Sequence, residues 1–136
     1  MFKNILIPVA LNPENDISKV VAAAGLLVSK GGKLTMLHVL EEVPRYVADR
    51  LPKTALKESQ QRAESDLETL ATAAGPDVAR KMVEGHGART ILAEAQRMGT
   101  DCIVMGSHTP GIGDYLIGST SAYVVRHATC PVFVIR

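Results

Sequence analysis

The sequence predicts an α/β fold: a doubly wound, five-stranded parallel sheet of the Rossmann-like type, with helices on both faces. Short apolar runs that suit buried strands alternate with longer segments of helical spacing, in the order β-α-β-α-β-α-β-α-β. The crossover between the first two strands is long enough only for a parallel pairing. The 136 residues contain no linker, repeat or low-complexity segment. We therefore expect one domain, residues 1–136.

The predicted strands are short and apolar, with many β-branched residues. Residues 3–9 and 102–105 are apolar enough to be buried on both faces, as strands of parallel sheets are. Residues 78–84 alternate apolar and polar, which suits a half-exposed strand at the edge of the sheet. The other two predicted strands span 34–40 and 131–135.

Four helices are predicted between the strands by apolar residues at helical spacing. The first begins near Asn12 or Asn15, either of which can cap it, and stops at Gly31 and Gly32. The other three span 53–74, 88–98 and 118–128. The segment 41–52 contains two prolines and no clear period, so we expect a loop there.

The composition is that of a globular domain and argues against nucleic acid or membrane as a partner. Hydrophobic residues make up 46% of the chain and charged residues 21%. The net charge is +1, the basic residues form no cluster, and aromatic residues are only 4%. The N-terminal apolar run is too short for a signal peptide, and no run approaches a membrane span. We therefore expect a cytoplasmic protein.

The cysteines and histidines predict no metal centre. Cys102 and Cys130 lie at or beside predicted buried strands and are interpreted as reduced thiols, the alternative being that one is redox-active. No C-x-x-C pair is present, and none of the four histidines has the spacing of a metal ligand. We expect His38 to be a satisfied residue of the core or its rim, and we connect only His108 with a ligand.

The stretch 101–119 has the order strand, glycine, loop, helix N-terminus. Gly106 ends a buried strand, and Ser119 and Thr120 lead into the last helix. This order commonly builds a phosphate site, because Gly106 has no Cβ to block a ligand and the N–H groups and positive dipole end of the helix favour an anion. The alternative is structural: Ser119 or Thr120 caps the helix, and the glycines only make turns.

The predicted topology brings a second strand end to the same place. Ligands of doubly wound sheets bind at the carboxyl ends of strands where the winding reverses. The first and fourth predicted strands flank this point. Pro8, Val9 and Ala10, at the end of the first strand, would then face the same crevice as Gly106.

Four segments stand out together: the opening KNILIPVA, the end of the second strand LHVLE, the turn EGH before the third helix, and the closing IVMGSH…GSTSAYVVRHATCPVFVIR. In these segments, and over its full length, the sequence resembles the universal stress protein family, small cytoplasmic α/β domains of which many bind ATP. The family's nucleotide signature is Gly-x2-Gly-x9-Gly-Ser/Thr. Here it is Gly106-x2-Thr109-x8-Gly118-Ser119.

Two positions depart from the family's pattern. Thr109 replaces the second glycine and the loop is one residue shorter, although the run is similar to a subgroup that has a bulky residue and then Pro after Ser-His and that also binds ATP. Ala10 stands where nucleotide-binding relatives often have Asp near the adenosine and the metal. The resemblance therefore does not extend to a metal or ribose contact from the first loop.

The resemblance implies an adenine nucleotide, ATP with or without Mg²⁺, and a set of contact residues. From the nucleoside to the terminal phosphate, these would be Pro8, Val9, Ala10, Val39, Met105, Gly106, His108, Thr109, Gly118, Ser119 and Thr120. Val39 would pack against adenine, and Ser119 and Thr120 would hold phosphates at the helix N-terminus. For Val39 and Met105, the alternative is plain core packing.

Three functions stay open. The first is a stress-response regulatory or signalling protein in which ATP orders the loop 107–117 and alters a surface read by a protein partner. The second is a weak ATP-hydrolysing or nucleotide-transferring enzyme, and the third is an interaction module that has lost nucleotide binding. We favour the first, because the sequence has no G-x-x-x-x-G-K-[ST], no G-x-S-x-G and no obvious acid/base pair for efficient catalysis.

The last predicted strand also suggests assembly. It is apolar, and at a sheet edge its backbone would be open to pairing with another chain. The resemblance implies the same, since family members commonly dimerise through this strand. We expect a homodimer or a homotetramer.

Overall fold

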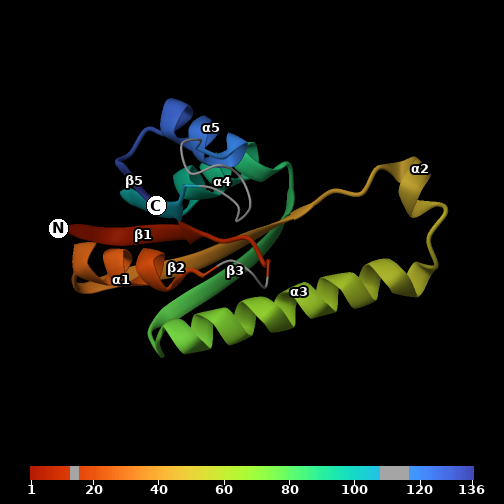
Figure 1. Cartoon of the computed structure of the whole chain (residues 1–136), viewed down its shortest axis with the longest axis horizontal. Helices are drawn as coiled ribbons and strands as arrows, with labels where there is room; N and C mark the ends of the chain where they lie inside the picture. The colour runs from red at the N-terminus through yellow and green to blue at the C-terminus, as the bar shows by residue number, and fades with distance from the viewer. Residues whose placement is uncertain (13–15, 108–116) are drawn as a thin grey trace.

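The computed structural model describes residues 1–12, 16–107 and 117–136, and its centre is a five-stranded parallel sheet (Figure 1). The strands are β1 (Phe2–Pro8), β2 (Val28–Glu41), β3 (Val78–Gly85), β4 (Cys102–Gly106) and β5 (Val132–Ile135). Their order in the sheet is β3-β2-β1-β4-β5. The predicted doubly wound, Rossmann-like fold is confirmed, with β1 and β4 adjacent where the winding reverses.

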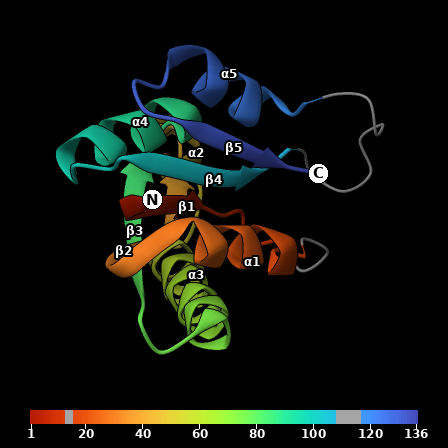
Figure 2. The same cartoon turned by 90° about the vertical axis from the view of Figure 1, so that its left-hand side faces the viewer.

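Helices cover both faces of the sheet (Figure 2). One face is covered by α1 (Ser18–Leu27) and α3 (Lys53–Ala74), and the other by α4 (Gly87–Arg97) and α5 (Ser119–His127). In a parallel sheet with helical crossovers, each helix runs back against the strands, so its N-terminus lies at the carboxyl ends of the strands. The N-termini of α4 and α5 are therefore at the edge of the sheet where a ligand is expected.

Side chains of β1 alternate between two buried clusters, one under each helical layer. Ile5 and Ile7 are fully buried with residues of α1 and α3. Leu6 is fully buried on the opposite face, together with Ile91 of α4 and Val124 of α5. This alternation explains why the strand reads as a continuous apolar run in the sequence.

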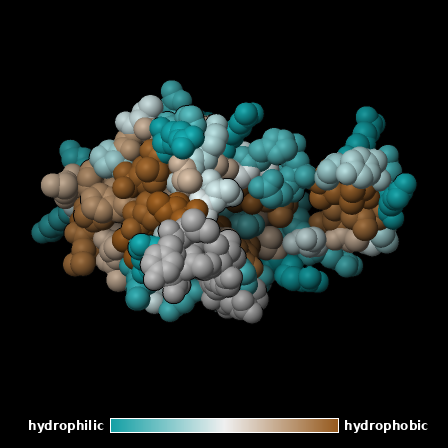
Figure 3. Space-filling model, turned by 45° about the horizontal axis from the view of Figure 1, so that its top comes forward, coloured by the Kyte–Doolittle hydropathy of each residue, from teal (hydrophilic) through white to brown (hydrophobic). Residues whose placement is uncertain are grey.

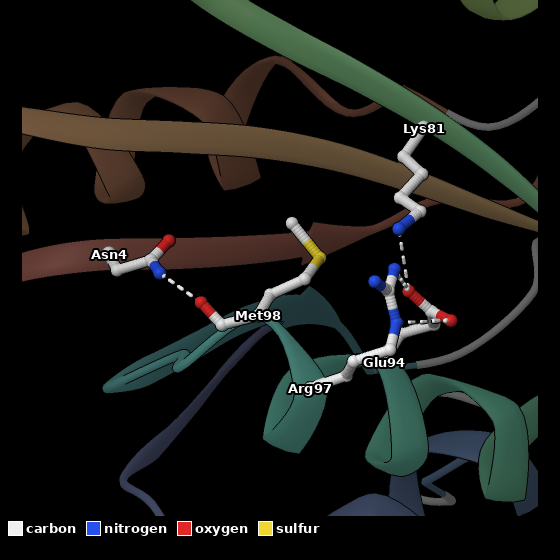
Figure 4. Close-up of polar contacts among 5 residues, drawn as sticks. All are labelled: Asn4, Lys81, Glu94, Arg97 and Met98. Carbon is white, nitrogen blue, oxygen red and sulfur yellow. Dashed lines mark hydrogen bonds and ion pairs between the residues drawn. The ribbon is translucent and has the colours of Figure 1, made fainter.

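Polar contacts fasten the C-terminal half of α4 and the residue after it to the sheet (Figure 4). The Glu94 carboxylate forms ion pairs with the Lys81 ammonium of β3 at 3.0 Å and with the Arg97 guanidinium at 2.5 Å. The Asn4 side-chain amide of β1 donates a hydrogen bond of 2.7 Å to the carbonyl oxygen of Met98. The C-terminal half of α4 is thus held to both β1 and β3.

The second strand is longer than predicted, and the first helix is shorter. β2 begins at Val28, and Gly31 and Gly32, expected to end the helix, lie inside the strand. The pairing with β1 shifts register between Phe2 and Asn4, and Gly31 has a φ of +79° at this irregularity. A Cβ on Gly32 would lie 2.7 Å from Val28 Cγ2, 2.9 Å from the Ser29 carbonyl oxygen and 3.1 Å from the Phe2 carbonyl oxygen. The two glycines therefore serve strand pairing and do not terminate the helix.

The start of α1 also differs from the prediction. The helix begins at Ser18, well after Asn12, and Asn15 lies outside the described residues. Instead, Asp16 accepts a hydrogen bond of 2.9 Å from the backbone N–H of Ser18, and this bond lowers the pKa of Asp16. A carboxylate thus occupies the N-terminus of α1.

The segment between β2 and α3 contains a helical turn, α2 (Arg45–Ala48), where a loop was predicted. This turn and the first turns of α3 project beyond the sheet (Figure 1). Val43 and Leu51 are 39% and 40% exposed, and Figure 3 shows apolar surface at this end of the molecule. Among the helices of the described segments, none combines the length and the apolar character needed to cross a membrane.

Candidate functional site

A cleft of about 390 Å³ lies at the carboxyl ends of β1, β2 and β4, between the N-termini of α4 and α5. Its lining residues are Pro8, Val9, Ala10, Asn12, Leu37, His38, Val39, Glu41, Gly87, Ile91, Met105, Gly106, Gly118, Ser119, Thr120 and Ser121. All the predicted site residues that the structure describes are in this set. His108 and Thr109, the other two, lie outside the described residues.

The end of β1 is held against β2 by two hydrogen bonds. The Val9 backbone N–H donates to the Leu37 carbonyl oxygen at 2.8 Å, and the Val9 carbonyl oxygen lies 3.0 Å from His38 Nδ1. Because a carbonyl oxygen can only accept, Nδ1 must donate in this bond. The expectation that His38 is a satisfied residue at the rim of the core is confirmed, and its bond fixes the backbone that leads into Ala10.

The first turn of α5 lies against the end of β4. The Gly118 N–H donates to the Ser107 carbonyl oxygen and the Ser121 hydroxyl donates to the Gly106 carbonyl oxygen, each at 2.7 Å. The first backbone bond within the helix runs from the Ala122 N–H to the Gly118 carbonyl oxygen. The N–H groups of the three residues between them, 119–121, therefore have no partner within the helix.

Ser119 and Thr120 do not cap this helix. The cap residue is Gly118, and no side chain bonds to the cap among the residues described. Both hydroxyl side chains are exposed and line the cleft. The alternative that Ser119 or Thr120 caps the helix is therefore wrong.

Gly106 leaves space at the end of β4. Its φ is not positive, since the described glycines with positive φ are Gly31, Gly75 and Gly99. Among the atoms of the described residues, a Cβ there would meet only Val20 Cγ2, at 4.0 Å. Neither the backbone geometry nor the packing of the described residues requires glycine at this position, and its missing side chain leaves space in the cleft.

The N-termini of α1, α4 and α5 differ in their partners. Asp16 lies at the N-terminus of α1, and Glu41 Oε1 accepts a hydrogen bond of 2.9 Å from the Gly87 N–H at the N-terminus of α4. Within the described segments, α5 has no such carboxylate at its first N–H groups. Of the three helices, α5 is therefore the one whose positive end is available to a bound anion.

The cleft offers few charged groups. Glu41 is the single carboxylate among its described lining residues, and no Lys or Arg is among them. No group of three or more His, Cys, Asp or Glu side chains in the described part of the chain is arranged to hold a metal ion. Glu41 is already bonded to Gly87, so these lining residues provide no carboxylate beside α5 for a Mg²⁺ ion.

Several lining residues were missed from the sequence. They are Asn12, Leu37, His38, Glu41, Gly87, Ile91 and Ser121. Ser121 could have been found, because it follows two predicted site residues within the same helical turn. Glu41 and Gly87 are 46 residues apart and meet only through the packing of α4 beside β2, which no local pattern reveals.

The whole chain, residues 1–136, matches the family model described as Universal stress protein family. Universal stress protein G of Escherichia coli O157:H7 is 31% identical over 144 residues, with 100% of both chains covered. The Thermus aquaticus protein named "Universal stress protein in QAH/OAS sulfhydrylase 3'region" is 34% identical over 139 residues, again with 100% of both covered.

Solved structures of universal stress proteins have the same fold. Universal stress protein UspA from Lactobacillus plantarum superposes with a TM-score of 0.76 at 25% identity, covering 98% of this chain and 97% of the other. A universal stress protein in complex with cAMP has a TM-score of 0.60 at 19% identity (99% and 97% covered), and one from Archaeoglobus fulgidus in complex with dAMP has 0.65 at 16% (98% and 97% covered). The family model and the relatives together show that this chain belongs to the universal stress protein family.

Proposed function

We propose that this protein binds an adenine nucleotide, ATP in the form implied by its family, and acts as a cytoplasmic regulatory protein of the stress response. The observation that supports this most directly is that one cleft joins the open N-terminus of α5 to an apolar wall at the ends of β1 and β2. A nucleotide requires such a combination, since its phosphate is an anion and its base is a flat, largely apolar ring.

The phosphate end of the ligand would lie at α5. The N–H groups of residues 119–121 have no partner within the helix, and the hydroxyls of Ser119 and Thr120 are exposed beside them. The space over Gly106 admits a phosphate close to the backbone. Since no Lys or Arg lines the described cleft, helix N–H groups would provide most of the attraction.

The base end would lie at β2 and α4. Pro8, Val39 and Ile91 give this part of the cleft an apolar surface. β2 and β4 are separated by one strand, so their ends lie about 10 Å apart, which suits a ligand that stretches from base to phosphate. The complexes of related proteins with cAMP and dAMP support a ligand of this class.

Regulation would act through assembly and through the segment after β4. β5 is an edge strand and Phe133 on it is 38% exposed, which supports a homodimer, or a homotetramer built from it, with pairing at this edge. The loop expected to respond to ATP, 107–117, lies largely outside the described residues. A partner protein would sense the nucleotide through this surface.

Calorimetric titration and thermal unfolding with ATP, ADP and AMP, with and without Mg²⁺, test the proposal. A ligand at ten times its dissociation constant should stabilise the native state by about 1.4 kcal/mol. Gly106→Val should fold, because a Cβ there comes no closer than 4.0 Å to any atom of the described residues, but should lose most of the binding. The control is Gly25→Ala on α1, where a Cβ meets no atom of another described residue within 4 Å.

The outcomes separate the candidate functions. Binding by the wild type and the control, lost in Gly106→Val, supports the regulator. Release of ADP from ATP in the same samples would favour the weak enzyme. No stabilisation by millimolar nucleotide would overturn the proposal and favour the interaction module.

A further inference from the structure

We propose that Glu41 reads the base of the bound nucleotide by accepting a hydrogen bond from the amino group at position 6 of the purine. This inference rests on the proposed nucleotide function and names the residue that would make the cleft prefer a 6-aminopurine. Glu41 lines the cleft but is not among the contact residues that the family resemblance implies.

The Glu41 carboxylate has one oxygen fixed and one uncommitted. Oε1 accepts a hydrogen bond of 2.9 Å from the Gly87 N–H, at the N-terminus of α4. A Cβ on Gly87 would lie only 3.0 Å from this oxygen, so the glycine permits the close approach. The hydrogen bonds recorded for the described residues leave Oε2 without a donor. The carboxylate is therefore anchored, with acceptor capacity left for a ligand.

Glu41 lies at the base end of the cleft. It is the last residue of β2, whereas the N–H groups for the phosphate are at α5, beside the end of β4. A carboxylate beside the phosphate would repel it. Glu41 is separated from the phosphate end by the width of β1, and at that distance the repulsion between the two negative charges is weak in water. The position of the carboxylate thus suits a neutral hydrogen-bond donor and not a phosphate.

The chemistry of the purine edge then sets the preference. An ionised carboxylate only accepts hydrogen bonds. Adenine presents an amino donor at position 6, whereas hypoxanthine presents a carbonyl oxygen there, which would face Oε2 as acceptor against acceptor. The cleft should therefore bind AMP more tightly than IMP, which has the same sugar and phosphate.

Glu41→Gln should reverse this preference. The Gly87 N–H can pair only with an acceptor, so it fixes the glutamine amide with its oxygen at the position of Oε1. The amide NH₂ then takes the place of Oε2 and presents a donor to the base. A donor pairs with the 6-oxo group of IMP and opposes the amino group of AMP.

The experiment is a calorimetric titration of the full chain with AMP and with IMP, for the wild type, Glu41→Gln and the control Glu42→Gln. Glu42 is the exposed neighbour that does not line the cleft. The ratio of the AMP to the IMP dissociation constant should change by about tenfold in Glu41→Gln, since one net hydrogen bond is exchanged for another. Glu42→Gln should keep the wild-type ratio.

Two results overturn the inference, and they can be told apart. If the wild type binds AMP and IMP equally, or if Glu41→Gln keeps the wild-type ratio, Glu41 does not read the base, and the proposed nucleotide function stands. If neither nucleotide binds the wild type, and ATP and ADP also do not bind, the proposed function itself fails. The wild-type ratio needs no variant, so poor folding of Glu41→Gln cannot hide the answer.

Discussion

The Ser121 hydroxyl donates a hydrogen bond of 2.7 Å to the carbonyl oxygen of Gly106. This bond joins the first turn of α5 to the last residue of β4, and Ser121 is only 4% exposed. It positions the helix N-terminus over the glycine that keeps the cleft open. The stability of the fold and the geometry of the candidate phosphate site therefore depend on the same contact.

Ser121→Ala should lower the free energy of unfolding by about 1 kcal/mol, because it removes a buried hydrogen bond. Ser119→Ala is the matched control: the same change on the same turn, at an exposed hydroxyl that makes no cap bond within the described segments. Urea unfolding measures both. Equal stability of the two variants would show that the Ser121 bond contributes nothing.

Gly85 should tolerate no side chain. This residue is buried at the end of β3, and a Cβ there would collide with the side chain of Thr90 on α4. Gly85→Ala should cost about 1–3 kcal/mol, the usual range for overpacking. Thermal or urea unfolding gives the value.

A double-mutant cycle shows whether Thr90 is the cause. Thr90→Ala removes the hydroxyl that lies nearest to the added Cβ. Gly85→Ala should therefore cost much less in the Thr90→Ala background than in the wild type. The same cost in both backgrounds would mean that the strain arises elsewhere.

The sequence predicted most of the fold because its signals are local. Apolar runs marked four strands, and alternation of apolar and polar residues marked the strand 78–84. The helix 53–74 has the predicted bounds, since it has helical periodicity and is followed directly by Gly75 and Pro76. The errors fall where a contact made in the fold overrides a local signal. Gly31 and Gly32 are normal helix terminators, but here Gly31 has a positive φ at the register shift between β1 and β2, and the close approach of Phe2 leaves no room for a side chain at Gly32.

The residues of the candidate site also divide into those that local signals predict and those that they do not. Pro8, Gly106 and Gly118 were predictable because each stands at the end or start of a predicted element, where the topology brings a ligand. His38, Glu41 and Gly87 were not, because their hydrogen bonds join segments that are distant in sequence. Part of the cleft lining could thus be predicted from the sequence, whereas the other lining residues and the hydrogen bonds between them required the structure.

Acid should destabilise the protein partly through Asp101. Its carboxylate accepts backbone hydrogen bonds from the Lys3 N–H at 2.9 Å and the Asn4 N–H at 3.0 Å, and these bonds, first of all that from Lys3, lower the pKa of Asp101. Because the pKa of Asp101 is lower in the folded protein than its unfolded value of about 3.9, the stabilisation from these bonds is fully present at pH values well above 3.9. It is lost as the pH falls through the folded pKa.

Asp101→Asn tests this pH dependence. The amide cannot ionise, so the difference in unfolding free energy between pH 7 and pH 3 should be smaller in the variant than in the wild type. Urea unfolding at the two pH values measures it. The same difference in both proteins would show that Asp101 does not contribute to acid sensitivity.

Cys102 should be inert in the folded protein. Burial raises the pKa of its thiol to about 11, and the side chain is fully buried on the face of the sheet covered by α1. Burial also raises the pKa of Cys130, which packs against the opposite cluster, so the two thiols face different sides of the sheet. Because the thiolate is the reactive form, both thiols should react slowly at neutral pH.

In Cys130→Ser, Cys102 should react with a thiol reagent only as fast as the protein unfolds, and at once in urea. Rapid reaction of the folded variant at pH 7 would instead support the redox-active thiol that the sequence left open.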